Sequence, residues 1–163
     1  MTTATPSRYR RSSILPPRAF LAALLSQLPL VAADWPLRPA MVEVVAGAVL
    51  IMAGAMLNVW SERLFRRAEV GVCPFSPAPV LVVRGPFALS RNPMYLGLVA
   101  ISAGLAITTG VLANLWITTT LAVWLHYAYV LPEEAFLRDR FGAEFEQYAR
   151  RVPRWVLIAD RNG

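Results

Sequence analysis

The stretch that decides the fold is residues 92–132, NPMYLGLVAISAGLAITTGVLANLWITTTLAVWLHYAYVLP. It contains no Asp, Glu, Lys or Arg over 41 consecutive positions. An α-helix needs about 20 apolar residues to cross a bilayer core about 30 Å thick. The stretch is too long for one crossing and suits two, with a hinge near Gly110 to Asn114. It therefore predicts a membrane-spanning helical hairpin.

Two further apolar segments precede this hairpin. Residues 39–61 carry one charge, Glu43, and are long enough to span a membrane. Residues 19–33 are short for a span and reach the required length only if Ile14 and Leu15 are included and Arg18 extends its charge to the interface. An alternative for 19–33 is a cleavable signal peptide, because small residues precede Asp34.

The composition supports a membrane protein. Of 163 residues, 56% are apolar and 16% are charged, against about 25% charged in a soluble domain. A single cysteine, Cys73, excludes a disulfide scaffold. We expect one all-α domain over residues 1–163, a polytopic bundle of about four transmembrane helices plus a C-terminal amphipathic helix.

The basic residues predict the orientation of the bundle. All 16 are arginine, and 15 of them fall on one side when the chain alternates sides at each loop; Arg38 alone falls on the other. The positive-inside rule places the rich side and both termini in the cytoplasm, with a bacterial inner membrane as the expected location. Because topology accounts for the net charge of +6, we expect membrane lipids and no nucleic acid as partners.

The segments outside the spans have distinct compositions. We expect a basic N-terminal arm at 1–18 and a proline-rich cytoplasmic loop at 62–91, which apolar Val80–Val83 predicts to be an ordered cover. Apolar residues recur at helical spacing over 133–155, which predicts one amphipathic helix continuing from the hairpin. Its simplest role would be anchorage at the membrane surface.

The first polar constellation, residues 84–97, begins the hairpin. Pro93 suits the first position of a helix, and Asn92 then stands at the N-cap. The helix N-terminus, with Arg91 beside it, favours a carboxylate or phosphate, and Tyr95 offers a ring and a hydroxyl in the first turn. The alternative is an ordinary cap with a headgroup anchor.

The second constellation is Glu133-Glu134, where the hairpin ends. Two adjacent acids repel each other unless a cation is shared, although acids are also common in the first turn of a helix. Together the two constellations favour a ligand with an anionic and a cationic end, such as an amino acid that carries a sulfonium. We expect no metal site, and we expect the single histidine, His126, to be a packing residue.

The ordered motifs of residues 85–155 resemble the isoprenylcysteine carboxyl methyltransferase family and its phospholipid methyltransferase relatives. They are Gly85-Pro86-Phe87, Arg91-Asn92-Pro93-Met94-Tyr95-Leu96-Gly97, Glu133-Glu134, Phe141-Gly142-Ala143-Glu144-Phe145-Glu146-Gln147-Tyr148 and Val152-Pro153-Arg154-Trp155. The resemblance implies an integral membrane enzyme that uses S-adenosylmethionine on its cytoplasmic face. Asn92 stands where many members of the family have histidine, and asparagine cannot take a proton.

The resemblance also implies roles for individual residues. The cofactor-binding set that it implies is Gly85, Arg91, Asn92, Pro93, Tyr95, Gly97, Glu133 and Glu134. As catalytic residues we predict Arg91, which would orient an anionic acceptor, and Glu134, which would accept a proton from an amine acceptor.

The predicted function is methyl transfer from S-adenosylmethionine to a lipophilic or small thiol, carboxylate or amine acceptor. Two alternatives remain at this point, a membrane reductase related to sterol reductases and a non-enzymatic membrane scaffold. The sequence leaves the identity of the acceptor, the use of a general base and the oligomeric state open.

Overall fold

The computed structural model describes residues 15–33, 39–68, 80–111 and 113–156. These residues form helices and connecting segments, with no β-strand among them. The elements are α1 (Pro16–Ala33), α2 (Met41–Arg67), the 3₁₀ turn η2 (Gly85–Ala88), α3 (Pro93–Thr108), α4 (Asn114–Leu125), the π-helical η3 (His126–Val130), α5 (Leu131–Phe141) and α6 (Ala143–Arg151).

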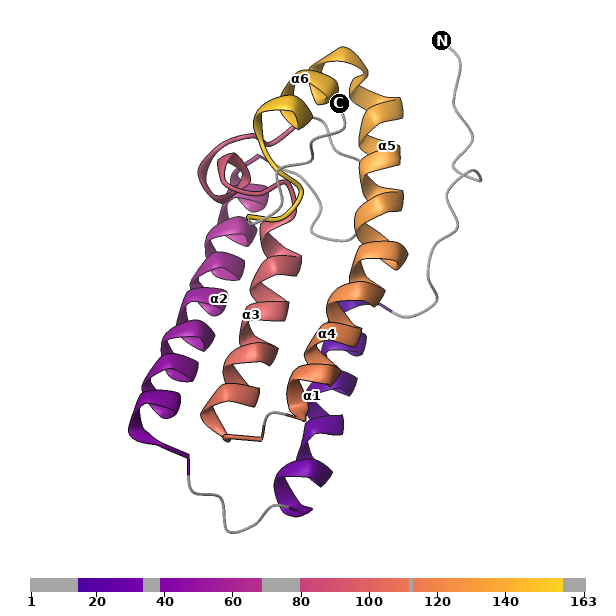
Figure 1. The fold of residues 1–163 in the computed structure, drawn as a ribbon. Coiled ribbons are helices and arrows are strands. Elements are labelled where there is room, and N and C mark those ends of the chain that lie inside the picture. Colours follow the sequence, from indigo (N-terminus) through magenta and orange to yellow (C-terminus); the bar gives the residue numbers. More distant parts are fainter. Residues whose placement is uncertain (1–14, 34–38, 69–79, 112, 157–163) are drawn as a thin grey trace.

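The long helices run antiparallel along a common axis (Figure 1). α3 lies between α2 and α4, while α1 packs beside α4; η2 and α6 cover one end of the bundle. A helical hairpin is present, because α3 ends at Thr108, Gly110 turns with a φ of +70°, and α4 begins at Asn114; that it crosses a membrane stays a prediction. A positive φ at this position suits glycine, which has no Cβ to strain.

The α2–α3 interface is built on glycine. A Cβ on Gly104 would stand 2.6 Å from the Gly47 carbonyl oxygen, and one on Gly54 would stand 2.6 Å from that of Gly97. The paired glycines are seven residues apart on both helices, so they recur on the same face after two turns. Small residues at such positions let two helices approach until their backbones touch, as in membrane helix pairs.

Buried polar side chains join α1 to the rest of the bundle. The Gln27 amide donates to the Ser102 hydroxyl at 2.9 Å, and Ser102 shares a second 2.9 Å hydrogen bond with Thr118. All three side chains are buried. Since an unpaired polar group is costly in an apolar interior, this chain of hydrogen bonds favours one packing of α1 against α3 and α4.

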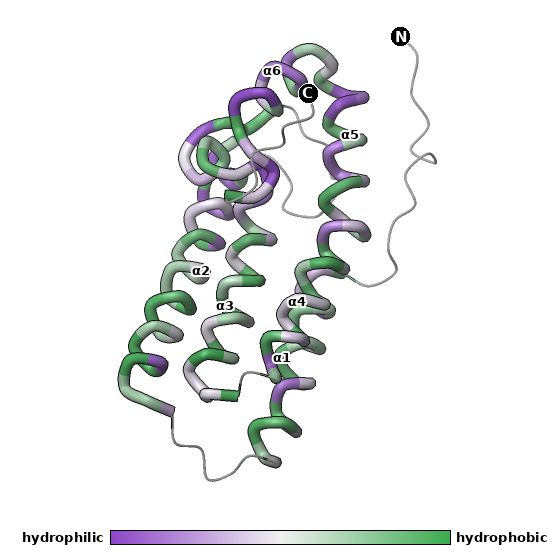
Figure 2. The backbone as a smooth tube through the Cα atoms, viewed as in Figure 1, coloured by the Kyte–Doolittle hydropathy of each residue, from purple (hydrophilic) through white to green (hydrophobic). Residues whose placement is uncertain are grey.

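The shafts of the helices are mostly hydrophobic residues, and hydrophilic residues gather at the end that carries α5, α6 and η2 (Figure 2). By length and composition, one described helix, α2, could cross a membrane, and α3 is apolar but shorter. Exposed Val45, Val49, Met52 and Met56 lie along α2. The all-helical class is thus confirmed for the described residues, whereas the number of crossings stays a prediction.

One continuous rod runs from α4 through η3 into α5 (Figure 1). Pro132 has no N–H, and its ring clashes with the carbonyl four residues back in a regular α-helix. The wider π turn at His126–Val130 lies directly before it, and Leu131 N–H donates to the His126 carbonyl across this turn. The sequence predicts a helix that continues from the hairpin, and the wider turn explains how this helix passes Pro132 without a break.

The single amphipathic helix predicted over 133–155 is wrong in its bounds. The chain breaks at Gly142, which has a φ of +52°, and α6 follows as a separate helix that ends at Arg151. α6 is the amphipathic part. Its apolar residues Phe145 and Tyr148 pack with Val152 against Leu81 and Leu137, so this face covers the bundle end instead of reaching a membrane surface.

The predicted loop at 62–91 also begins too early, because α2 continues to Arg67. Its described part, residues 80–91, is ordered as expected: Leu81 packs against α6, and Phe87 is buried and stacks on Phe65 with ring centroids 4.9 Å apart. The predicted arm at 1–18 lies mostly outside the described residues.

Candidate active site

Glu134 is the centre of a buried ion cluster at the covered end of the bundle. Its carboxylate accepts hydrogen bonds from Arg154 Nη2 at 2.9 Å and from Arg91 Nη1 at 3.3 Å. The Arg154 Nε contacts both carboxylate oxygens at 3.1 Å, and the Asn92 amide donates at 3.3 Å. The Arg91 and Glu134 side chains are each 4% exposed. Because a carboxylate in such surroundings needs paired cations, the cluster holds its members in place.

Local geometry brings these residues together. Pro93 opens α3 as predicted, which leaves residues 90–92 as a non-helical lead-in to the helix. Ser90 accepts from the Asn92 N–H at 3.1 Å and donates to the Arg154 carbonyl at 2.9 Å. The Arg91 N–H donates to the Pro153 carbonyl at 3.0 Å. The start of α3 is therefore tied to the segment that follows α6.

The predicted cap at Asn92 is only half right. Asn92 stands at the N-cap position, but its side chain makes no capping hydrogen bond. Its amide instead donates to Glu134 and, at 3.4 Å, to the Arg154 carbonyl. The Nδ2 donor of Asn92 is thus engaged with a charged acceptor, which gives a stronger hydrogen bond than a neutral one.

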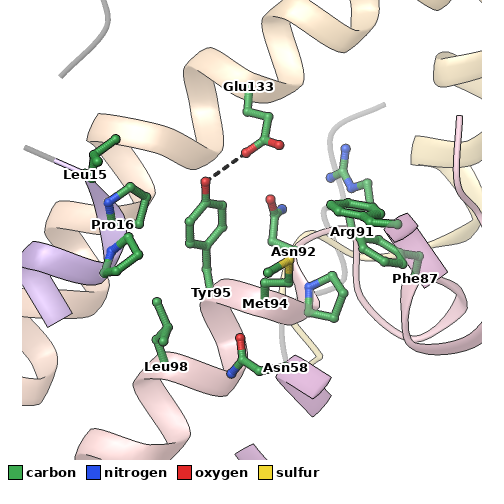
Figure 3. Close-up of a pocket in the computed structure, with 13 residues that line it drawn as sticks. Leu15, Pro16, Asn58, Phe87, Arg91, Asn92, Met94, Tyr95, Leu98 and Glu133 are labelled. Carbon is green, nitrogen blue, oxygen red and sulfur yellow. Dashed lines mark hydrogen bonds between the residues drawn. The ribbon is translucent and has the colours of Figure 1, made fainter. Parts of the chain in front are cut away.

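Glu133 faces a different partner from Glu134. The Tyr95 hydroxyl donates to Glu133 Oε2 at 2.9 Å (Figure 3). The two adjacent glutamates therefore divide, one toward the arginines and one toward α3. Glu134 thus has Arg91 and Arg154 as its cations, whereas Glu133 accepts a hydrogen bond from a hydroxyl.

Burial changes the acidity of Glu133. It raises the pKa of the carboxyl from the ordinary value of 4.5 to about 7; the hydrogen bond from Tyr95 lowers it, and the nearby charge of Glu134 raises it further. A carboxyl with a pKa near 7 exchanges its proton in the physiological range. Glu133 thus has the acidity expected of a general base.

A cavity of ≈ 250 Å³ lies beside this pair. Figure 3 shows Tyr95 and Glu133 between Leu15 and Pro16 on one side and Arg91 and Phe87 on the other. Five of the eight predicted cofactor-binding residues line the cavity: Arg91, Asn92, Pro93, Tyr95 and Glu133. Whole-ligand pockets usually measure about 300–1,000 Å³, so this cavity suits one part of a larger ligand.

The remaining three predicted residues lie elsewhere. Glu134 is behind the cavity in the ion cluster, and Gly97 touches α2, where its missing Cβ leaves room for the Gly54 carbonyl. Gly85 has a φ of +62° and lies against Leu64 and Trp60 of α2. Both glycines therefore permit close contacts between parts of the chain, and neither lines the cavity.

Sequence reasoning missed Arg154 and Asn58. Arg154 belongs to a quoted motif, but no spacing rule connects it to Glu134 twenty positions earlier. Asn58 lines the cavity and donates to the Gly54 carbonyl at 3.0 Å. A lone asparagine within an apolar helix was the available signal, because polar groups at that depth are expensive. Among the described residues, no group of His, Cys, Asp and Glu could hold a metal ion.

Comparison with known proteins gives two concordant results. A family model described as phospholipid methyltransferase matches residues 42–144. A probable protein-S-isoprenylcysteine O-methyltransferase from Oryza sativa subsp. japonica is 37% identical over 75 residues, which are 44% of this chain and 38% of the relative. Protein-S-isoprenylcysteine O-methyltransferase B of Arabidopsis thaliana is 35% identical over 79 residues, 47% of this chain and 39% of the relative.

The chain thus spans less than two-fifths of the curated relatives that it matches. No solved structure matches it with statistical significance.

Proposed function

We propose that this chain, which belongs to the phospholipid methyltransferase family, transfers a methyl group from S-adenosylmethionine to a lipophilic acceptor at the membrane. The observation that carries the proposal is the division of the paired glutamates: Glu133 lines a cavity together with Arg91, while Glu134 holds Arg91 from behind. A cavity with a carboxylate and a guanidinium in its wall fits a ligand that is cationic at one end and anionic at the other.

The residues present fit the cofactor. Glu133 and the Tyr95 ring would hold the cationic end, because a cation is attracted both to a carboxylate and to the face of an aromatic ring. The Arg91 guanidinium would pair with the carboxylate end. When bound, S-adenosylmethionine supplies a methyl group carried on a cationic sulfur.

The residues around the cavity align the reactants and limit access of water. Glu134, which Arg154 holds in place, keeps the Arg91 guanidinium in one orientation. The Arg91 side chain therefore loses little conformational entropy when a ligand binds. The stacked rings of Phe65 and Phe87 close one side of the cavity with apolar surface. Low polarity favours a step in which opposite charges on donor and acceptor cancel.

A proton acceptor is needed only for some acceptors. A carboxylate or thiolate needs none once it is ionised, whereas an amine must lose a proton. Both oxygens of Glu134 already accept from guanidinium groups, so we assign Glu134 a positioning role. Glu133, with a pKa of about 7, is the better candidate for a base.

The names of the relatives suggest an acceptor class. They are named as O-methyltransferases of S-isoprenylcysteine. This is a lipid-modified amino acid, and the oxygens that its name offers for methylation are those of its carboxylate. We extend the carboxylate class, and not the particular substrate, to this chain. The proposed orientation places the ion cluster and both termini on the cytoplasmic side, in agreement with the arginines at that end.

Calorimetric titration of S-adenosylhomocysteine into the full chain in nanodiscs tests the proposal. We expect saturable binding, and in a parallel titration of S-adenosylmethionine we expect Glu133→Gln to weaken binding at least about tenfold, because the carboxylate that would face the sulfonium loses its charge. Glu62→Gln is the matched control, because Glu62 pairs with Arg66 on exposed α2 away from the cavity. Absence of binding to the unmodified chain, or saturable binding of NADPH in its place, contradicts the proposal.

A further inference from the structure

One polar side chain of α2 lies in the wall of the cavity. α2 contributes Phe65 and Asn58 to the lining of this ≈ 250 Å³ cavity, and most of the other lining residues are apolar. Asn58 is half-buried and lies across the pocket from Glu133 (Figure 3). A polar group in apolar surroundings costs free energy unless it is hydrogen-bonded, so the partners of the Asn58 amide bear on what the cavity binds.

The Asn58 amide has one stable orientation. Its Nδ2 donates to the Gly54 carbonyl at 3.0 Å. A carbonyl can only accept, so the NH₂ group must lie on that side and Oδ1 on the other. Gly97 of α3 leaves the space in which the amide lies, because a Cβ added there would overlap Asn58 Nδ2 and stand 3.0 Å from its Cγ. A reversed amide would set its oxygen against the Gly54 carbonyl oxygen, and the two acceptors would repel each other.

The Asn58 Oδ1 atom is left for a ligand. Among the described residues, no side chain and no backbone N–H donates a hydrogen bond to it. Figure 3 shows this oxygen on the side of the amide that faces Tyr95. The amide cannot exchange this acceptor for a donor, since Nδ2 is already engaged with Gly54. An atom that can only accept is matched most selectively by a group that can only donate, such as an amino group, because a hydroxyl is held equally well by a donor.

We propose that Asn58 is a specificity-determining residue of this cavity, whose Oδ1 accepts a hydrogen bond from an amino group of the bound ligand. The inference rests on the proposed function, because the ligand is then the cofactor. S-adenosylmethionine and S-adenosylhomocysteine both carry two such groups, the ammonium of the amino-acid end and the amine of the adenine ring. A ligand without the matching group leaves Oδ1 unpaired in apolar surroundings, which is how a buried acceptor discriminates against it.

Titration of three ligands into the full chain and into Asn58→Leu, both in nanodiscs, tests the proposal. The ligands are S-adenosylhomocysteine, its analogue without the α-amino group, and S-inosylhomocysteine, in which an oxygen replaces the adenine amine. In the unmodified chain we expect one analogue to bind at least about tenfold more weakly than S-adenosylhomocysteine, and in Asn58→Leu we expect the same two ligands to differ about threefold or less. The analogue whose loss disappears identifies the amino group. If each analogue loses the same factor in both chains, the proposal is overturned.

Two further variants separate hydrogen bonding from packing. Asn58→Ala also removes the acceptor and adds no bulk, so it must give the same result as Asn58→Leu. Ser61→Ala is the matched control, because Ser61 donates to the Leu57 carbonyl four residues back on α2, at 2.7 Å, and does not line the cavity. We expect it to leave the affinity for S-adenosylhomocysteine unchanged.

The same titrations separate this inference from the proposed function. If Asn58→Leu and Asn58→Ala bind S-adenosylhomocysteine as tightly as the unmodified chain, the role of Asn58 is overturned and the proposed function stands. Absence of binding to the unmodified chain rejects the proposed function and the role of Asn58 with it.

Discussion

α3 meets its two neighbours in opposite ways. Toward α2 it presents glycines, and the two backbones touch without intervening side chains. Toward α5 its lead-in segment presents Arg91 and Asn92, whose side chains reach the buried Glu134. The first interface depends on shape and the second on charge. The comparison shows how one helix can be fixed along its shaft by close packing while its first turn is positioned by a few strong contacts.

The largest effect is expected at the charged interface. Glu134→Gln keeps the shape of the side chain but leaves Arg91 and Arg154 without their shared carboxylate. Removing one partner of a buried ion pair typically costs about 3–5 kcal/mol, so we expect a loss of this size in the free energy of unfolding. Equilibrium unfolding of the purified chain in mixed micelles measures it.

Glu62→Gln is the control for this change. It breaks an ion pair with Arg66 whose side chains are 41% and 75% exposed. Exposed pairs contribute about 0–1 kcal/mol. If both variants lost the same free energy of unfolding, the buried cluster would contribute no more to stability than an exposed ion pair.

The next effect is expected at the glycine interface. A leucine at Gly104 would meet the Gly47 carbonyl, which as backbone cannot move aside. Forcing extra atoms into a packed interface costs about 1–3 kcal/mol, and we expect Gly104→Leu to lose that much stability. Because Gly104 lies near the far end of α3, the affinity for S-adenosylhomocysteine should fall much less than the stability.

Val45→Leu is the matched control, since Val45 is an exposed residue of α2 and its larger replacement meets no neighbour there. The glycine contact would be unimportant for α2–α3 packing if both variants unfolded at the same denaturant concentration as the unmodified chain.

The smallest effect concerns the hydrogen bond from the Tyr95 hydroxyl to Glu133 in the wall of the cavity. The pKa of Glu133 is about 7, so affinity for cationic S-adenosylmethionine should rise as the pH passes through 7. S-adenosylhomocysteine lacks the sulfonium charge and should show a weaker dependence. Tyr95→Phe removes a hydrogen bond that favours the ionised carboxylate, so the midpoint should move up by about one pH unit, equivalent to about 1.4 kcal/mol. Titrations from pH 5.5 to 8.5 measure both curves.

The same shift has a consequence for stability without ligand. Between 4.5 and about 7 the folded chain retains the Glu133 proton that the unfolded chain has lost. The folded state therefore binds more protons in this window, and the free energy of unfolding should fall as the pH rises through it. If the pH midpoint of S-adenosylmethionine affinity stays unchanged in Tyr95→Phe, the hydrogen bond from Tyr95 does not lower the pKa of Glu133.

Sequence reasoning reached the local features and missed the long-range ones. The hinge at Gly110 and the helix start at Pro93 follow from short-range rules, and the structure has both. The partnership of Glu134 with Arg154 depends on how α6 folds back, which no local pattern encodes. Gly97 was assigned to the cofactor because the family resemblance implies it, whereas in the structure its missing side chain makes room for α2.

Two positions in the C-terminal region also show that local sequence rules do not fix where a helix ends. Gly142 was quoted within a motif and its meaning as a helix end was overlooked, although a glycine between two amphipathic segments commonly ends a helix. Pro132 would interrupt a regular α-helix, and the preceding π turn accommodates it. Propensity alone does not decide between ending a helix and widening one turn, because tertiary contacts on both sides determine which costs less.

The continuous rod from Asn114 to Phe141 also controls the depth of the chemistry. At 1.5 Å per residue, Glu133 stands about 28 Å along the axis from Asn114, close to the ~30 Å thickness of a hydrocarbon core. In the proposed orientation, one helix end at the far interface therefore fixes Glu133 at the near one, within reach of headgroups and of a water-borne cofactor. Adding or deleting a residue within this rod would change that depth and turn both glutamates away from their partners in a single step.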